Sequence, residues 1–333
     1  MNLLKTLALL LALMTANTPA HAACQGTDMK PLLSVADTVA LDARLAAMPY
    51  PDGLLWQAQR GDHLIHIVGT LHMGDAMVDR LFARITPLLT NTALVLLEAT
   101  PTEEQALKTA IASRPELVFI TSGPTLPDLM SAPDWQRLAD AATARGIPSF
   151  MAAKSQPWFL MMMLGAPPCL MAEMQSGERM GLDHQIARAA TAAGIPMQAL
   201  EPFDTLFRLF AGEPMDEQIR LMLLSLATPQ QGEDMLATLT ALYRAEAHAA
   251  AWQINRPLAR LTSDLPADQI DAIFDQLTEI LIDQRNRDWM KTIENTPSAN
   301  TLIAVGAGHL AGEFGLLNLL DQAGYTLTRM AID

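Results

Sequence analysis

The sequence lacks the short motifs that mark the common nucleotide-binding and hydrolase sites. It contains no glycine-rich P-loop and no Gly-x-Gly-x-x-Gly fingerprint, so nucleotide binding has no signature here. The Gly-x-Ser-x-Gly nucleophile elbow and the His-Glu-x-x-His zinc motif are also absent. No local pattern therefore predicts a nucleotide-binding protein, a serine hydrolase or a zincin.

Positive charge is scarce in this chain. Its 333 residues include 22 Lys and Arg against 36 Asp and Glu, which gives a formal net charge of −14. Such an acidic chain repels the nucleic-acid backbone and anionic membrane surfaces, so we expect neither as a partner. A divalent cation or a cationic peptide is compatible with this charge. Half of the residues are apolar, which is typical of a folded protein.

Cysteine is also rare, with Cys24 and Cys169 as the two copies. They are far apart and form no Cys-x-x-Cys pair, so they are weak evidence for a metal or redox site. In an oxidising compartment an even number of cysteines favours a disulfide, which would tie the mature N-terminus to the middle of the chain. Two unpaired thiols are the alternative.

Long apolar runs are missing except near the start. Lys5 precedes an apolar run at residues 7–14, and an Ala-His-Ala cleavage signal follows at 20–22. This pattern predicts a signal peptide over residues 1–22 and export to the periplasm or the medium. The run is too short to span a bilayer, and no later stretch is a convincing span. A lipoprotein acylated on Cys24 is the less favoured alternative.

Two distant stretches share one pattern, His-Ile-Val-Gly-Thr-Leu-His at 66–72 and Ile-Ala-Val-Gly-Ala-Gly-His at 303–309. Each predicts a buried strand, then Gly-x-x-His, then an amphipathic helix. We expect this duplication to lie on one mixed α/β sheet, flanked by helices and built from the N-terminal third and the C-terminal tail. A large helical insertion at about 203–295 would complete a single domain over residues 23–333.

Apolar periodicity and turn residues predict the other elements. Helix-ending glycines followed by proline, at 146–148 and 194–196, are typical exits from helix into strand. We expect helices at 29–49, from 76 to about Pro87 and at 310–322, and strands at 54–58, 64–71, 94–98, 149–153, 197–201, 301–305 and 325–330.

Four residues that can carry chemistry follow strand ends, namely His72, Glu98, Glu201 and His309. Ligands of open α/β sheets bind at the carboxyl ends of the strands. Two imidazoles and a carboxylate suit Zn²⁺, Mn²⁺ or Co²⁺ and leave room for a water. A metal there would lower the pKa of that water and polarise a carbonyl. Core or surface histidines and salt-bridged carboxylates are the alternatives.

Arg285 continues an apolar stripe formed by residues 274, 277 and 281. An arginine at such a position can bind a substrate carboxylate or stabilise an oxyanion. The alternative is an arginine that extends to solvent from the edge of the core. At the start of another predicted helix, Asp183 is either a simple N-cap or a functional residue, and we expect His184 to face solvent. We also expect His248 to be solvated.

Several ordered motifs together resemble one family. They are Cys24-x-Gly26, Gly69-Thr70-Leu71-His72, Leu97-Glu98, Lys154-x-x-Pro157-Trp158, Gly181-Leu182-Asp183, Leu200-Glu201, Arg285-Asn286 and Val305-Gly306-Ala307-Gly308-His309-Leu310. Over nearly all of the mature chain, this set resembles the TraB/GumN family. That family is related to the Tiki proteases and, more distantly, to erythromycin-esterase-like and ChaN-like proteins.

The resemblance implies an α/β fold whose active site holds two Gly-x-x-His motifs and an acidic residue. In the Tiki branch such a site is associated with metal-dependent proteolysis of N-terminal peptide segments. Carried over, His72 and His309 become metal ligands, and Glu98 becomes a ligand or a general base.

The sequence thus predicts an exported metal-dependent hydrolase, most similar to a peptidase. In this hypothesis Glu98 or Glu201 handles the proton and Arg285 orients the substrate. One alternative is a non-catalytic periplasmic protein that binds a peptide or a haem-like ligand. Another is an ester hydrolase of the erythromycin-esterase type.

Overall fold

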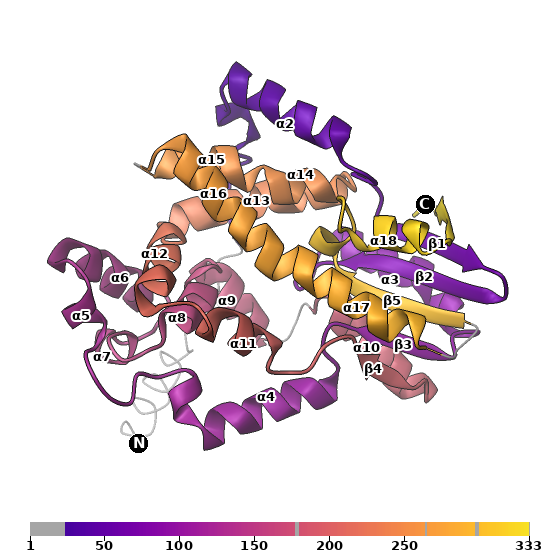
Figure 1. Cartoon of the computed structure of the whole chain (residues 1–333), viewed down its shortest axis with the longest axis horizontal. Helices are drawn as coiled ribbons and strands as arrows, with labels where there is room; N and C mark the ends of the chain where they lie inside the picture. The colour runs from indigo at the N-terminus through magenta and orange to yellow at the C-terminus, as the bar shows by residue number, and fades with distance from the viewer. Residues whose placement is uncertain (1–23, 177–179, 264, 297–299, 333) are drawn as a thin grey trace, which may run out of the picture.

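The structure is a computed structural model that describes residues 24–176, 180–263, 265–296 and 300–332 (Figure 1). The predicted signal peptide lies outside these residues. Strands gather at one end of the molecule, and most of the helices lie toward the other end. The strands are β1 (Leu55–Arg60), β2 (His63–Thr70), β3 (Leu94–Leu97), β4 (Met197–Ala199), β5 (Asn300–Gly306) and β6 (Thr326–Arg329).

Helices occupy most of the remaining chain. Those before β4 are η1 (Lys30–Leu32), α2 (Val35–Ala47), α3 (Ala76–Leu89), α4 (Pro101–Ser113), η2 (Pro115–Leu117), α5 (Leu126–Leu129), α6 (Ala132–Ala144), α7 (Ser149–Ala152), α8 (Pro157–Leu164), α9 (Pro168–Ser176) and α10 (Leu182–Ala193). Those after β4 are α11 (Thr205–Ala211), α12 (Met215–Leu224), α13 (Pro229–Arg244), α14 (His248–Gln253), α15 (Asn255–Thr262), α16 (Ala267–Thr278), η3 (Glu279–Asp283, a π-helix), α17 (Gln284–Glu294), η4 (Ala307–His309) and α18 (Leu316–Gln322).

The sheet has the strand order β4-β3-β5-β2-β1-β6. Strands β4, β3, β5 and β2 pair in parallel, whereas β1 runs antiparallel to both β2 and β6. The predicted mixed α/β sheet is therefore confirmed. Because β2 and β5 are parallel neighbours, the two Gly-x-x-His turns leave the sheet side by side.

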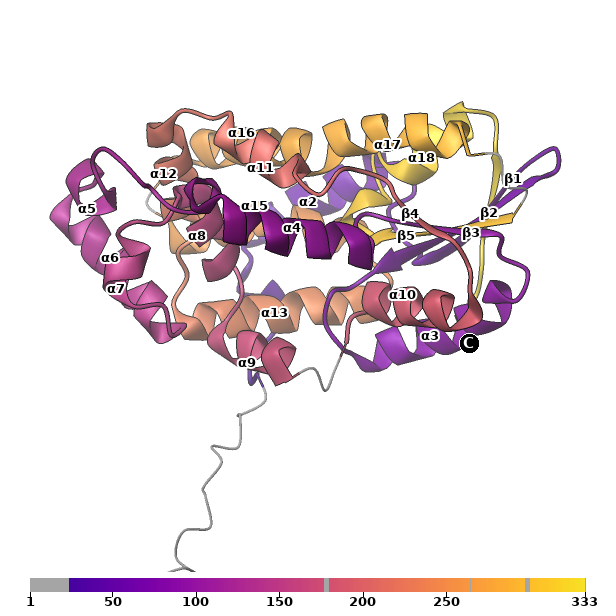
Figure 2. The same cartoon turned by 90° about the horizontal axis from the view of Figure 1, so that it is seen from below.

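Side chains alternate between two cores, one on each face of the sheet. On β5, Leu302 and Ala304 enter the core that includes α3 and α10, and Ile303 and Val305 enter the core that includes α17 and α18. This period of two is what a strand buried on both faces requires. Figure 2 shows the two helix layers on opposite sides of the sheet.

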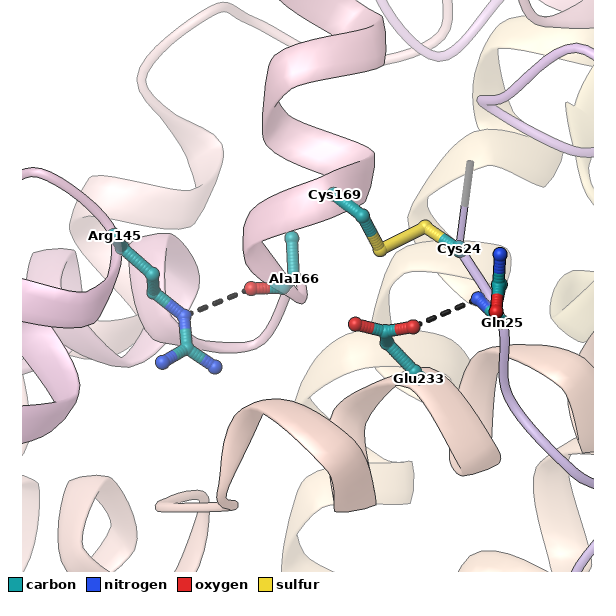
Figure 3. Close-up of a disulfide and its surroundings, with 6 residues drawn as sticks. All are labelled: Cys24, Gln25, Arg145, Ala166, Cys169 and Glu233. Carbon is teal, nitrogen blue, oxygen red and sulfur yellow. Dashed lines mark hydrogen bonds between the residues drawn. A yellow bond between two sulfur atoms is a disulfide. The ribbon is translucent and has the colours of Figure 1, made fainter. Parts of the chain in front are cut away.

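A disulfide joins Cys24 to Cys169 at the start of α9, which confirms the predicted pair (Figure 3). Beside it, the Gln25 backbone N–H donates to Glu233 Oε2 at 2.7 Å, which anchors the first described residues on α13. Within the described ranges, no helix is long and apolar enough to cross a membrane.

Three local predictions were wrong. Residues 149–152 form α7 instead of a strand, because they lie away from the sheet and their side chains at Phe150 and Met151 face solvent. The helix after His309 begins only at Leu316, since η4 and a turn intervene. His248 is buried rather than solvated, because α14 packs against both α2 and η4.

One expected helix end also differs. Helix α3 continues through Pro87 to Leu89, although a proline inside a helix removes one backbone hydrogen bond. Leu89 is buried in the core beneath the sheet, and this packing favours the last turn.

Candidate active site

The predicted residues meet at one edge of the sheet. In the β2–β5 register Thr70 pairs with Gly306, so His72 and His309 follow neighbouring strand ends. Glu98 directly follows β3, the other neighbour of β5, and Glu201 follows β4. Parallel strands place all their carboxyl ends on the same edge, which explains why four distant segments converge there.

Gly306 lies at the centre of this arrangement. Its backbone N–H donates to Glu98 Oε1 at 2.6 Å. A Cβ at this position would lie 3.2 Å from Glu98 Oε1, 3.7 Å from His309 Cδ2 and 3.9 Å from His72 Nε2. The glycine therefore leaves a space that all three side chains face.

Arg285 of α17 connects the two carboxylates. Its Nη2 donates to Glu98 Oε2 at 2.6 Å and to Glu201 Oε1 at 2.7 Å, and its Nε donates to Glu201 Oε2 at 2.9 Å. Its Nη1 lies 3.2 Å from His309 Nε2. The two carboxylates raise the pKa of the guanidinium despite its burial, so Arg285 is a permanent cation between two anions.

His309 is held as a neutral, oriented ring. Asn286 Nδ2 donates to the carbonyl oxygens of His309 and Phe314, so Asn286 Oδ1 must face the ring, 2.7 Å from His309 Nδ1. An amide oxygen can only accept, so Nδ1 carries the proton and Nε2 keeps its lone pair. The ring also stacks on Trp289 with centroids 4.4 Å apart. Burial lowers the pKa of His309 to about 3.

His72 has a different environment. Its Nδ1 lies 3.3 Å from Asp183 Oδ1 at the start of α10, while 64% of its side chain is exposed. The Asp183 carboxylate raises the pKa of His72 above its ordinary value of 6.5, and solvent around the exposed ring limits this rise. The contact therefore favours the protonated ring.

Asp183 continues this chain of polar contacts toward the surface. Its Oδ2 lies 3.0 Å from His184 Nδ1, and His184 Nε2 lies 3.1 Å from Glu104 Oε1. Burial would raise the pKa of Asp183, but the two histidines outweigh it and hold this pKa below its usual range. Asp183 is thus an ionised partner for His72 rather than a helix cap.

Gly181 brings Asp183 within reach of His72. A Cβ at Gly181 would lie 2.4 Å from the carbonyl carbon of His72, a distance that no side chain tolerates. The neighbouring Leu182 N–H donates to Leu71 O at 3.0 Å. Backbone contact between α10 and the first Gly-x-x-His turn therefore depends on glycine at this position.

The two carboxylates, Glu98 and Glu201, differ in their partners. Burial would raise the pKa of Glu98, but His309, Arg285, His72 and the Gly306 N–H together lower it to about 2. Both oxygens of Glu201 bind Arg285, and Oε2 also accepts from Trp289 Nε1 at 2.9 Å. Glu201 therefore holds Arg285 in place, and Glu98 is the carboxylate that faces the space beside Gly306.

The donor chemistry fits the divalent metal that the resemblance implies. His72 and His309 are each oriented through Nδ1 by an oxygen of another residue, which is the usual outer contact of metal-binding histidines. His309 Nε2 and Glu98 Oε1 lie 3.8 Å apart, and a metal on His309 would take the lone pair that Arg285 Nη1 now contacts. Among the described residues, no three His, Cys, Asp or Glu side chains already form a compact metal-binding group.

The structure thus brings His72, Glu98, Glu201, Arg285 and His309 together. Sequence reasoning did not assign the supporting roles of Asn286 and Trp289, which lie one position and one helical turn beyond Arg285 on α17. For Trp289 the spacing of four residues from Arg285, which places both on one helix face, was the available signal. For Asp183, a helix cap and a functional role were equally favoured, and only its contact with His72 separates them.

The fold and the site define an α/β protein with paired Gly-x-x-His turns at the carboxyl edge of its sheet. The model of the TraB/PrgY/gumN family matches residues 54–329, and the chain belongs to this family. It is 24% identical over 280 residues to uncharacterized protein YbaP of Escherichia coli strain K12, with 80% of this chain and 96% of that protein covered. The YbaP protein of Shigella flexneri gives the same identity and coverage.

Proposed function

We propose that this protein is a metal-dependent hydrolase of amide bonds, similar to a peptidase and exported to the periplasm or the medium. The observation that supports it is the convergence of His72 Nε2, Glu98 Oε1 and the His309 ring on the space left by Gly306. Export is supported by the N-terminal signal sequence and by the Cys24–Cys169 disulfide, because such bonds persist in oxidising compartments.

In this proposal Glu98 orients the attacking water, and because the low pKa of Glu98 makes it a weak base, the water must become more acidic before Glu98 can take its proton. Each of its oxygens accepts one hydrogen bond, from Gly306 N–H and from Arg285, and each keeps a second lone pair. All five N–H groups of Arg285 already face acceptors, so in this proposal it acts on the developing oxyanion through its fixed positive charge. Glu201 positions Arg285 through two hydrogen bonds.

His72, His309 and Glu98 would hold the metal, and His72 would bind it through Nε2 only after losing the proton that Asp183 stabilises. Bound there, a divalent metal supplies Lewis-acid polarisation of the carbonyl and lowers the pKa of a water. Asn286 and Asp183 set the ring orientation of the two histidines through their Nδ1 atoms.

A second candidate is a metal-free esterase, and one pair of contacts favours it. Arg285 Nη1 already lies beside His309 Nε2, and Asp183 favours the protonated form of His72. A protonated His72 can act as a general acid that donates its proton to the leaving alcohol. Both candidates use the same space beside Gly306.

Metal content and substrate panels separate the two candidates. We expect the purified wild-type protein to carry a divalent metal, and the His72→Ala/His309→Ala variant to lose it, as measured by plasma mass spectrometry. His66→Ala is the matched control, because His66 lies on β2 before the turn and should leave metal content unchanged. Chelation should abolish hydrolysis of peptide amides.

Metal at background level in the wild-type protein would contradict the metal-dependent proposal. Ester turnover that survives chelation and is lost in His72→Ala would favour the second candidate. Absence of turnover on both peptide and ester panels, with metal present, would contradict both.

A further inference from the structure

A cavity of about 930 Å³ has walls that come mainly from α6, α12 and α16 and from the turn between α12 and α13. These helices lie away from the sheet (Figure 1). None of the 21 residues that line the cavity belongs to the site beside Gly306. Its volume is in the range of about 300–1,000 Å³ that is typical of pockets for small ligands.

The walls of this cavity are mostly aliphatic. Fifteen of the 21 lining residues are Ala, Leu, Ile, Met, Pro or Phe, and Phe274 is the one aromatic side chain among them. A planar ring or a nucleobase is usually held by aromatic stacking, and these walls offer very little of it. A flexible aliphatic chain matches them better, because its burial needs apolar area and no fixed stacking geometry.

The size of the cavity also favours an aliphatic ligand. The cavity is large enough for many waters, and 15 of its 21 lining side chains offer them no hydrogen bond. Replacing such water with hydrocarbon is favourable by roughly 25 cal/mol for each Å² of apolar surface removed from water. An aliphatic occupant is therefore stabilised by the same effect that stabilises the protein core.

The six polar lining residues lie in three places. Ser225, Thr228 and Gln231 lie at the α12–α13 turn, Arg137 and Asp140 lie on α6, and Ser263 directly follows α15. The two charges are of opposite sign, and Arg137 already contacts Asp134 at 3.4 Å. Thr228 and Gln231 already bond each other, but Arg137 has further N–H donors that can bind a small head group, while most of the ligand contacts hydrocarbon.

We propose that this cavity is a binding site for the aliphatic chain of an amphiphile, either a free fatty acid or a monoacyl lipid. This inference rests on the cavity alone and does not depend on the proposed hydrolase activity. It adds a second ligand site, in the helical region, to the one at the sheet edge.

Fluorescence of cis-parinaric acid, a fatty acid that becomes emissive when buried, tests the proposal on the full mature chain. We expect saturable binding with one probe per chain. Palmitate and a palmitoyl lysophospholipid are then added separately as competitors. If palmitate alone displaces the probe, the ligand is a free fatty acid. If the lysophospholipid displaces it, the ligand is a monoacyl lipid.

Variants that fill the cavity test whether the probe binds inside it. Ala141→Phe on α6 and Ala227→Phe in the α12–α13 turn add bulk from two different walls, and each should weaken probe binding at least tenfold. Ala272→Phe is the matched control, because Ala272 is exposed on α16 and does not line the cavity. Far-ultraviolet circular dichroism and thermal melting identify any variant that fails to fold.

Two results would overturn the proposal. One is the absence of saturable parinarate binding to the wild-type protein. The other is unchanged affinity in both folded Ala→Phe variants, which would place the probe elsewhere on the molecule.

Discussion

The two Gly-x-x-His turns leave neighbouring strands, yet their histidines have opposite environments. His309 is buried, neutral and fixed by Asn286 and Trp289. His72 is largely exposed, protonated and paired with Asp183. The same local sequence pattern has thus given one rigid hydrogen-bond acceptor and one accessible proton donor, on two sides of Glu98.

This difference follows from which helix packs against each turn. Helix α17 covers the His309 side with a polar network centred on Arg285, deep against the sheet. The start of α10 touches the His72 side through its backbone and through the Asp183 carboxylate. The paired turns are therefore not interchangeable, and variants of each side should have unequal effects.

Removal of the central cation should have the largest effect. Arg285→Met leaves Glu98 and Glu201 as mostly buried carboxylates without a counter-charge, so the free energy of unfolding should fall by about 3–5 kcal/mol. Arg287→Met is the matched control on the same helix. Its partly exposed pair with Glu279 should contribute about 0–1 kcal/mol. Urea denaturation measures both, and equal losses would mean that the network around Arg285 does not stabilise the His309 side.

Truncation of the two histidines compares the turns directly. His309→Ala leaves the buried Asn286 Oδ1 without a donor, which should cost about 1–3 kcal/mol of unfolding free energy. His72→Ala removes an exposed ring and should cost less than about 1 kcal/mol. The same urea measurement on both variants checks this order. A larger loss of unfolding free energy in His72→Ala than in His309→Ala would contradict this order.

Glycine substitutions sharpen the comparison at the backbone. Gly181→Ala forces a Cβ to 2.4 Å from the His72 backbone and should cost about 1–3 kcal/mol, since backbone rather than a flexible side chain must shift. Gly308→Ala, in the other turn, places its Cβ 3.7 Å from Ile282 and 3.8 Å from Trp252, which is ordinary contact. Thermal melting should therefore detect the first substitution and scarcely detect the second.

The proton affinities of the two rings give the subtlest test. In metal-free buffer, nuclear magnetic resonance titration should find the pKa of His72 raised above 6.5, toward the value of about 9 that full pairing with Asp183 would give, and His309 neutral down to about 3. Asp183→Asn should lower the pKa of His72 toward its ordinary value of 6.5 and leave His309 unchanged. A His72 pKa that does not respond to Asp183→Asn would rule out this pairing.

The same shifts give opposite pH dependences of stability. The raised pKa of His72 stabilises the fold fully below pH 6.5, and this contribution is lost as pH rises toward 9. The lowered pKa of His309 contributes above pH 6.5, and this contribution is lost as pH falls toward 3. When the free energy of unfolding from urea denaturation is plotted against pH, His72→Gln should therefore differ from wild type in slope only between about pH 6.5 and 9.

Much of the sheet edge could be predicted from the chain. Apolar strands that each end in Gly-x-x-His or Glu are local patterns, and parallel strands bring their carboxyl ends together whatever lies between them. His72, Glu98, Glu201 and His309 were therefore found by spacing alone. The burial of His248 was missed, because it depends on α2 and η4, which are far away in the sequence.

The sequence by itself determined the α/β class, the family and the residues at the strand ends, because these depend on short-range periodicity and on motif order. Only the tertiary structure decided what each residue does there. It pairs Arg285 with two carboxylates, and it assigns Asp183 to His72 and Asn286 to His309. Those pairings arise because α10 and α17 pack on opposite faces of one sheet, and no local pattern encodes which face a distant helix will cover.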